Sequence, residues 1–215
     1  MTAYSFALFA HILVVVYLLG ADLGRVYLAR LGAFGNLGGD ALQLAARGVL
    51  WLGSATNLAL VLILPAGISL GGALGVYRIV SPAWLAATWV VAGIWALLSI
   101  LADRAARVSE RRALPIADIV FRLILVPGFL YDGASTFIGT SQTVDAKWLA
   151  LKVMLYGLLI LISGVTRWVG FGLHRALANN DPERVRSALR SLLSPLLLGW
   201  VVILLAAWFG VSKSI

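Results

Sequence analysis

Six long apolar segments constrain the fold of this chain more than any other feature of its sequence. They lie at roughly residues 5–29, 46–70, 83–102, 115–132, 147–170 and 191–211. Each is close to the about 20 residues that cross a bilayer as a helix, and backbone groups in lipid favour helices because they must be hydrogen-bonded within their own segment. We therefore predict an all-α polytopic membrane bundle of six transmembrane helices, with residues 1–215 as a single integral membrane domain.

The composition excludes several other classes of protein. Of the 215 residues 61% are hydrophobic and 12% are charged, which leaves no stretch for a separate soluble domain. The net charge of +8 comes from basic residues in short loops, so it indicates topology and not a nucleic-acid partner. Cysteine is absent and methionine occurs twice. Disulfides and thiolate chemistry are therefore excluded, and a Cu(I) carrier, which needs soft ligands, is not expected.

The distribution of basic residues predicts the orientation of the chain. Alternate connections are rich in arginine and hold Arg25, Arg30, Arg47, Arg104, Arg107, Arg111, Arg112, Arg175, Arg184, Arg186 and Arg190. The other connections hold only Arg78, Lys147 and Lys213. The positive-inside rule then predicts that both termini lie outside. We expect the membrane to be the bacterial inner (cytoplasmic) membrane. The segment 115–132 has the weakest signal; without its crossing, the C-terminal half would be inverted.

One face of the first segment is polar along its length. His11, Asp22 and Arg25 fall within roughly 60° of one another around a helix, so this face must turn toward protein or water. The second, fourth and fifth segments also hold polar residues, whereas residues 84–101 and 192–211 contain no charge. We therefore predict an inner four-helix core of spans 1, 2, 4 and 5, with spans 3 and 6 at its edge.

The polar residues divide into two groups by depth. His11, Lys152 and Asp132 form an expected outer cluster. The expected inner cluster consists of Asp22, Arg25, Arg47, Asp118, Arg122, Arg167 and His174. So many arginines would suit an anionic group such as a propionate, a quinone oxygen or a lipid phosphate.

Each of these residues also has a simpler interpretation. The imidazole of His11 can ligate haem iron or relay protons, or it can be hydrogen-bonded to a neighbouring helix. Asp22 with Arg25, and Asp118 with Arg122, are spaced to pair with each other on one helix. Lys152 either belongs to a site or extends to the outer interface. The sequence GISLG at 67–71 matches G-x-S-x-G, but a nucleophile elbow needs a strand-turn-helix context, so we interpret this match as chance.

Three stretches of the sequence resemble a known family. They are the helix with His11, Gly20 and Arg25, the segment LVLILPAGISLGG at 60–72, and WLALKVMLYGLLILI at 148–162. They resemble small bacterial membrane proteins related to the copper-resistance D protein and to the membrane-bound, haem-containing protoporphyrinogen oxidase. The resemblance implies haem binding by His11, with Arg25 and Lys152 as the matching charged residues. The further histidines of the oxidase-like members are apolar or small residues here, so no second axial ligand is assigned.

The prediction from sequence is thus an integral membrane protein that binds haem b or a related porphyrin. His11 would be the metal ligand, Lys152 would be a partner in the outer half, and Arg25, Arg122 and Arg167 would neutralise acidic groups. Its role would be redox, either as an oxidoreductase of a porphyrin-like substrate that passes electrons to quinone, or as a cytochrome-like subunit. The alternative is a non-enzymatic component: a small proton-coupled transporter, or an accessory or anchor subunit of a larger complex. A homo-oligomer or a subunit of a membrane complex is expected in either case.

Overall fold

The chain folds into six long helices, as the sequence predicts. The computed structural model describes residues 3–77, 81–108, 113–141, 143–144 and 146–212. The helices are α1 (Ala3–Phe34), α2 (Gly39–Ala73), α3 (Pro82–Val108), α4 (Ala113–Phe137), α5 (Lys147–Ala178) and α6 (Pro182–Ser212). All six are long and apolar enough to cross a membrane, including α4. The protein is therefore a multi-pass, all-α integral membrane protein in contact with lipid.

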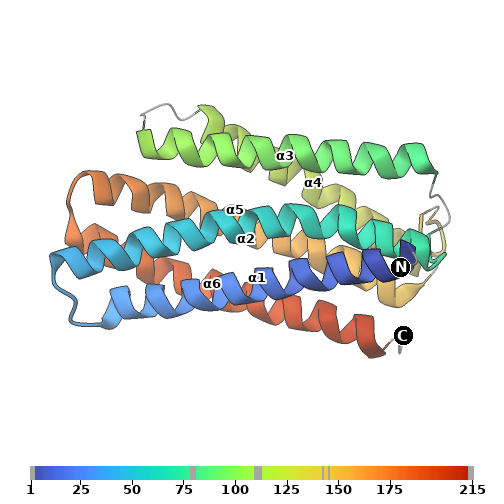
Figure 1. Cartoon of the computed structure of the whole chain (residues 1–215), viewed down its shortest axis with the longest axis horizontal. Helices are drawn as coiled ribbons and strands as arrows, with labels where there is room; N and C mark the ends of the chain where they lie inside the picture. The colour runs from blue at the N-terminus through green and yellow to red at the C-terminus, as the bar shows by residue number, and fades with distance from the viewer. Residues whose placement is uncertain (1–2, 78–80, 109–112, 142, 145, 213–215) are drawn as a thin grey trace.

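The two ends of the bundle differ in what they carry. Both chain termini lie at one end, which we call the outer end (Figure 1). The connections from α1 to α2 and from α5 to α6 lie at the opposite, inner end. The arginine-rich connections therefore gather at the inner end. Its location in the cytoplasm stays a prediction from the positive-inside rule.

Two helices begin at capping residues that are followed by proline. The Oγ of Ser81 accepts a hydrogen bond from the backbone N–H of Trp84 at 3.1 Å, and Oδ1 of Asp181 accepts one from the N–H of Arg184 at 3.0 Å. The missing N–H of proline costs nothing at the first helical position. Residues 181–190 form the cap and first turns of α6.

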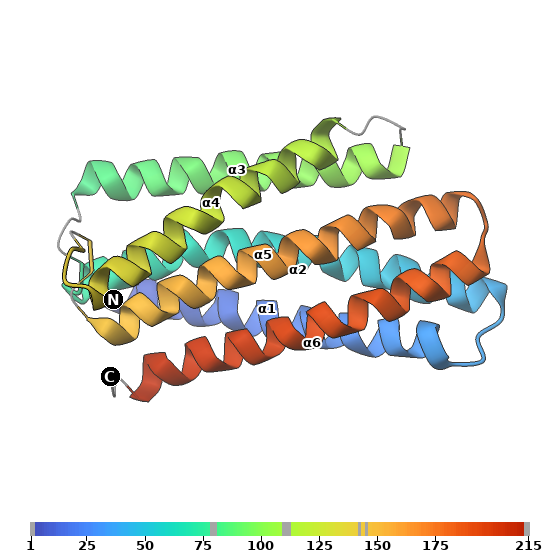
Figure 2. The ribbon, with the colours of Figure 1, turned by 180° about the vertical axis from the view of Figure 1, so that it is seen from behind.

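α2 and α5 have more helix neighbours than the other helices of the described chain. α2 contacts α1, α3, α5 and α6, while α5 contacts α2, α3, α4 and α6. Figures 1 and 2 show α3 at the edge of the bundle and α4 running obliquely between α3 and α5. Among the described residues α4 contacts α3 and α5, α1 contacts α2 and α6, and α6 contacts α1, α2 and α5. The predicted core members α2 and α5 are therefore shared by two groups of packed helices, one with α1 and α6 and the other with α3 and α4.

Apolar packing explains how α6 joins α1 and α2 although its membrane segment carries no charge. Leu189 and Leu192 are at most 1% exposed and belong to a core cluster at the inner end that also includes Ala29 and Val49. Helices in lipid associate through close packing as well as through polar contacts. Polarity indicates which helices have an inward face, but it does not indicate which apolar faces pack together.

Arginines of α6 also satisfy the end of α1. The last carbonyls of a helix have no partner within that helix. The guanidinium of Arg186 donates to the carbonyl oxygens of Gly32 at 3.3 Å, Gly35 at 2.9 Å and Leu37 at 2.8 Å. Arg190 donates to a fourth carbonyl of the same segment. These residues, expected only as topology determinants, also attach α6 to α1.

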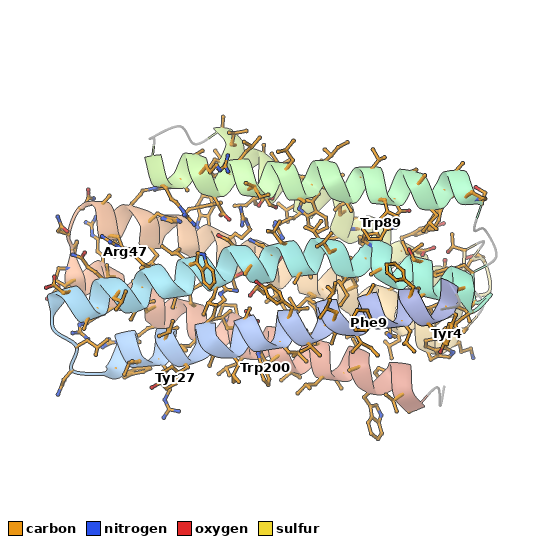
Figure 3. All side chains as sticks on the ribbon, in the orientation of Figure 1. Tyr4, Phe9, Tyr27, Arg47, Trp89 and Trp200 are labelled. Carbon is orange, nitrogen blue, oxygen red and sulfur yellow. The ribbon has the colours of Figure 1, made fainter. Side chains whose placement is uncertain are left out.

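Side chains on the outer faces of the helices are mostly apolar, as lipid contact requires (Figure 3). Phe9 and Tyr27 of α1 are 58% and 66% exposed. In α3, Trp89 donates a hydrogen bond to Oγ of Ser69 at 3.2 Å, and Ser69 donates to the carbonyl of Pro65. Ser69 therefore lies inside a membrane helix with its hydroxyl bonded, which agrees with a chance match to G-x-S-x-G.

Candidate functional site

The inner half of the bundle contains a buried ion pair on α1. The Nη1 of Arg25 donates to Oδ1 of Asp22 at 2.9 Å, and both side chains are less than 10% exposed. The three-residue spacing puts both groups on one face of the helix. The pairing expected from the sequence is therefore confirmed.

A second ionic group joins α3, α4 and α5. Asp118 is fully buried and accepts a hydrogen bond from Nε of Arg122 at 3.1 Å. The same carboxylate forms an ion pair with Arg167, which also pairs with Asp103 at 3.1 Å. The Oγ of Ser99 donates to Asp118 at 2.7 Å. Buried charges require such compensation, because an isolated ion in a medium of low dielectric constant is costly.

Aromatic rings complete the surroundings of these arginines. The guanidinium carbon of Arg122 lies 5.2 Å from the centroid of the Trp95 ring, and that of Arg167 lies 5.2 Å from the Phe171 ring. Guanidinium groups at this distance from an aromatic face are attracted to it.

The inner ionic groups are balanced in charge within the chain. They combine the three guanidiniums of Arg25, Arg122 and Arg167 with the carboxylates of Asp22, Asp103 and Asp118. The arginines that the sequence analysis assigned to the acidic groups of a haem therefore have carboxylate partners already. They also do not line the cavity that contains His11. Arg47 is exposed at the inner end (Figure 3).

The outer half contains a cavity of about 190 Å³, which is lined by residues of α1, α2, α4, α5 and α6 and by Leu74, Val76 and Tyr77. Most of its lining is apolar. The nitrogen-bearing side chains in the lining are His11, Trp148 and Lys152, and Tyr77 and Tyr156 contribute hydroxyl-bearing rings. The structure therefore confirms that His11 and Lys152 lie near each other.

Neither His11 nor Lys152 has an internal polar partner in the part of the chain that the structure describes. The buried Nδ1 of His11 makes no hydrogen bond. The ammonium of Lys152 has no carboxylate within ion-pair distance among the described residues, and it lies 6.0 Å from the centroid of the Trp148 ring. Unlike the inner half, the outer cavity therefore holds one cation without a carboxylate partner among the described residues.

Two glycines let these side chains approach a neighbouring helix. A Cβ at Gly67 of α2 would lie 3.5 Å from Cε1 of His11, and one at Gly210 of α6 would lie 2.7 Å from Nζ of Lys152. His11 therefore packs on the backbone of α2, and Lys152 extends across to α6.

Asp132, the third expected member of the outer cluster, lies elsewhere. Its carboxylate accepts a hydrogen bond from the hydroxyl of Thr143, and it does not line the cavity. Tyr77, which does line the cavity, forms an isolated antiparallel bridge with Val144. Burial and the charge of Asp132 raise the pKa of Tyr77 to about 12. Tyr77 therefore remains a neutral phenol at physiological pH.

The available donors for a metal are few. No group of three or more His, Cys, Asp and Glu side chains is placed to hold a metal ion among residues 3–77, 81–108, 113–141, 143–144 and 146–212. His11 is the only histidine or methionine in the cavity lining. A haem in this cavity would therefore have His11 as its only histidine or methionine ligand from the lining.

Other lining residues carry no signal of a site in the sequence. Tyr77 and Tyr156 carry no charge and match no motif. The only feature of the sequence that could have indicated a role for Tyr77 is its position directly after the glycine-rich end of α2. This position alone does not predict that Tyr77 lies in a cavity with residues of α5.

The fold and site define a six-helix integral membrane protein with an outer cavity that is mostly apolar. Comparisons with protein-family models, curated proteins and solved structures found no match. The resemblance to the copper-resistance D and protoporphyrinogen oxidase proteins therefore stays a prediction.

Proposed function

We propose that this membrane protein binds a quinone in its outer cavity, with the single-ring head group between His11 and Lys152. The observation that carries the proposal is that both side chains line one mostly apolar cavity, where Nδ1 of His11 makes no hydrogen bond and Lys152 has no carboxylate partner among the described residues. A quinone has carbonyl oxygens that accept hydrogen bonds, and its ring and isoprenoid tail are apolar. This chemistry matches two polar side chains among apolar walls.

The volume of the cavity favours a ligand with a single ring. A closed apolar cavity of about 150 Å³ accepts benzene, whereas pockets for drug-sized molecules measure about 300–1,000 Å³. The 190 Å³ cavity lies near the lower value. It is sufficient for a quinone head group, whose tail would extend into the bilayer.

The unpaired ammonium of Lys152 supports an oxygen-bearing ligand. Polar groups within membrane helices are costly unless they are paired or hydrated, and they commonly mark functional sites. A carbonyl oxygen of the ligand would accept a hydrogen bond from Lys152, and such bonds to a charged group contribute about 1.5–3 kcal/mol. The ligand would thereby give Lys152 a hydrogen bond that the described residues do not provide.

A bound quinone would give the protein a redox role. Quinones carry electrons and protons within the membrane, so a partner protein would exchange electrons with the bound molecule. The protein would then act as a quinone-binding subunit of a membrane complex.

The first prediction concerns Lys152. Titration of the purified protein with a short-chain quinone should give a Kd that Lys152→Met raises at least about tenfold, because the charged hydrogen bond is lost. The control is Lys147→Met, which removes an exposed lysine at the start of the same helix and should leave the Kd unchanged. Equal Kd values for the two variants would disprove the proposed role of Lys152.

A second candidate function is the predicted binding of haem b. The unpartnered Nδ1 of His11 supports it, and haem would supply one-electron redox chemistry with its potential set by its ligands. His11 would hold the iron and Lys152 would pair with a propionate. A tetrapyrrole is much larger than a single ring, so the helices around the 190 Å³ cavity would have to separate.

The absorption spectrum of the purified protein distinguishes the two candidates. Haem binding requires a Soret band that His11→Ala abolishes. A colourless protein at full quinone occupancy would exclude the haem candidate.

A further inference from the structure

Two smaller cavities extend from the outer cavity toward the inner end. The middle cavity has a volume of about 30 Å³ and the polar lining Asp22, Arg25, Thr56, Asn57, Ser163 and Thr166. The inner cavity has a similar volume and is lined by polar residues that include Arg25, Asn57, Asp103, Thr166, Arg167 and His174. Arg25, Asn57 and Thr166 line both. The two cavities are therefore adjacent.

Both cavities suit ordered water. A polar cavity of about 10–15 Å³ can hold one water molecule when two or more polar groups are placed to bind it. The Nε of Arg25, a residue that is 8% exposed, is buried without a hydrogen-bond partner. The amide side chain of Asn57, a residue that is 7% exposed, lines both cavities. Buried polar groups without protein partners usually bind water.

A single apolar layer separates this polar region from the outer cavity. Leu18, Leu159 and Ile203 line both the outer and the middle cavity. Leu18 is 1% exposed and lies between His11 and Asp22 on α1. The polar middle cavity and the mostly apolar outer cavity, which contains His11 and Lys152, thus lie on opposite sides of one layer of side chains.

We propose that this series of cavities conducts protons between the inner end and the outer cavity, and that the layer of Leu18, Leu159 and Ile203 forms its barrier. Protons enter near the partly exposed Asp103 and His174 and move along water bound to Asn57 and Arg25. They then pass Leu18 when the layer opens and reach the imidazole of His11.

The charged groups that line this path are paired with one another. Asp22 is paired with Arg25, and Asp103 with Arg167, so the charges along the path are balanced. A transferred proton therefore meets no uncompensated arginine in the middle cavity. Lys152 faces the path only beyond the apolar layer.

The test measures proton flux in liposomes that contain the purified full-length protein and a pH-sensitive dye. A potassium diffusion potential supplies the driving force, and no quinone is added. Leu18→Ala removes part of the barrier and should raise proton flux at least about fivefold over the natural sequence. Leu13→Ala is the control, because Leu13 lies on the lipid-facing side of the same helix and is 56% exposed.

Removal of the polar lining should reverse the effect. The double variant Leu18→Ala, Asn57→Leu keeps both ion pairs and should return the flux to that of the natural sequence. Leu18→Val removes less of the apolar layer and should also raise proton flux, and it replaces the alanine variant if that variant does not fold. Flux in both Leu18 variants no higher than in Leu13→Ala, or an increase that survives Asn57→Leu, would overturn the proposal. Because quinone is absent from the assay, its outcome is independent of the quinone proposal.

Discussion

Asp118 shows how a single residue accounts for the intramembrane arginines. Its carboxylate is fully buried and is shared between Arg122 of its own helix and Arg167 of α5. Removal of one partner from a buried ion pair leaves an uncompensated charge, which costs more than the pair itself contributes. The arginines of this group are therefore explained by internal pairing without an external ligand.

The Asp118→Asn variant tests this explanation. Arg122 loses its carboxylate partner, so the free energy of unfolding should fall by about 3–5 kcal/mol. The measurement is denaturant unfolding in detergent, followed by circular dichroism. Asp40→Asn, at an exposed position in the first turn of α2, should unfold like the natural sequence. Equal stability of the two variants would contradict the assigned role of Asp118.

Sequence reasoning at the residue scale succeeded where partners share a helix. The pairs Asp22–Arg25 and Asp118–Arg122 follow from helical spacing alone. The contacts of Arg167 with α3 and α4 depend on the rotation and register of three helices. No spacing in the sequence specifies those quantities.

At the scale of elements, charge indicated the packing of α4 but not that of α6. The charges of α4 indicated an inward face, and this face does meet α3 and α5. α6 has no charged residue in its membrane segment, yet its inner half packs against α1, α2 and α5 through leucines and against α1 through Arg186. Helix number and approximate span positions were therefore predictable, whereas the partners of α6 depended on contacts of its first turns with α1.

Arg186→Gln tests this attachment of α6 to α1. The variant loses charged hydrogen bonds to three carbonyl oxygens, so the free energy of unfolding should fall by about 1.5–3 kcal/mol. Arg184→Gln is the matched control two residues earlier. Arg184 is 75% exposed and pairs only with Asp181 among the described residues, so its loss should cost less than about 1 kcal/mol. Similar effects of the two variants would contradict the account of the α1 end.

At the scale of the whole molecule, the two halves of the bundle interior differ in their electrostatics. The inner half pairs each of three guanidiniums with a carboxylate. The outer half contains Lys152 without a carboxylate partner in the described chain, beside a cavity of about 190 Å³. The division by depth was predictable from the sequence, but the cavity was not, because it arises where side chains of several helices meet Val76 and Tyr77, the residues after α2.

The central claim is that this outer cavity holds a quinone through Lys152 and His11. The most direct measurement is the quinone content of the protein purified in mild detergent, determined by solvent extraction and chromatography. The account predicts close to one quinone per chain for the natural sequence and for Lys147→Met, and a large loss for Lys152→Met. No quinone in the natural protein, or equal content in the two lysine variants, would contradict it.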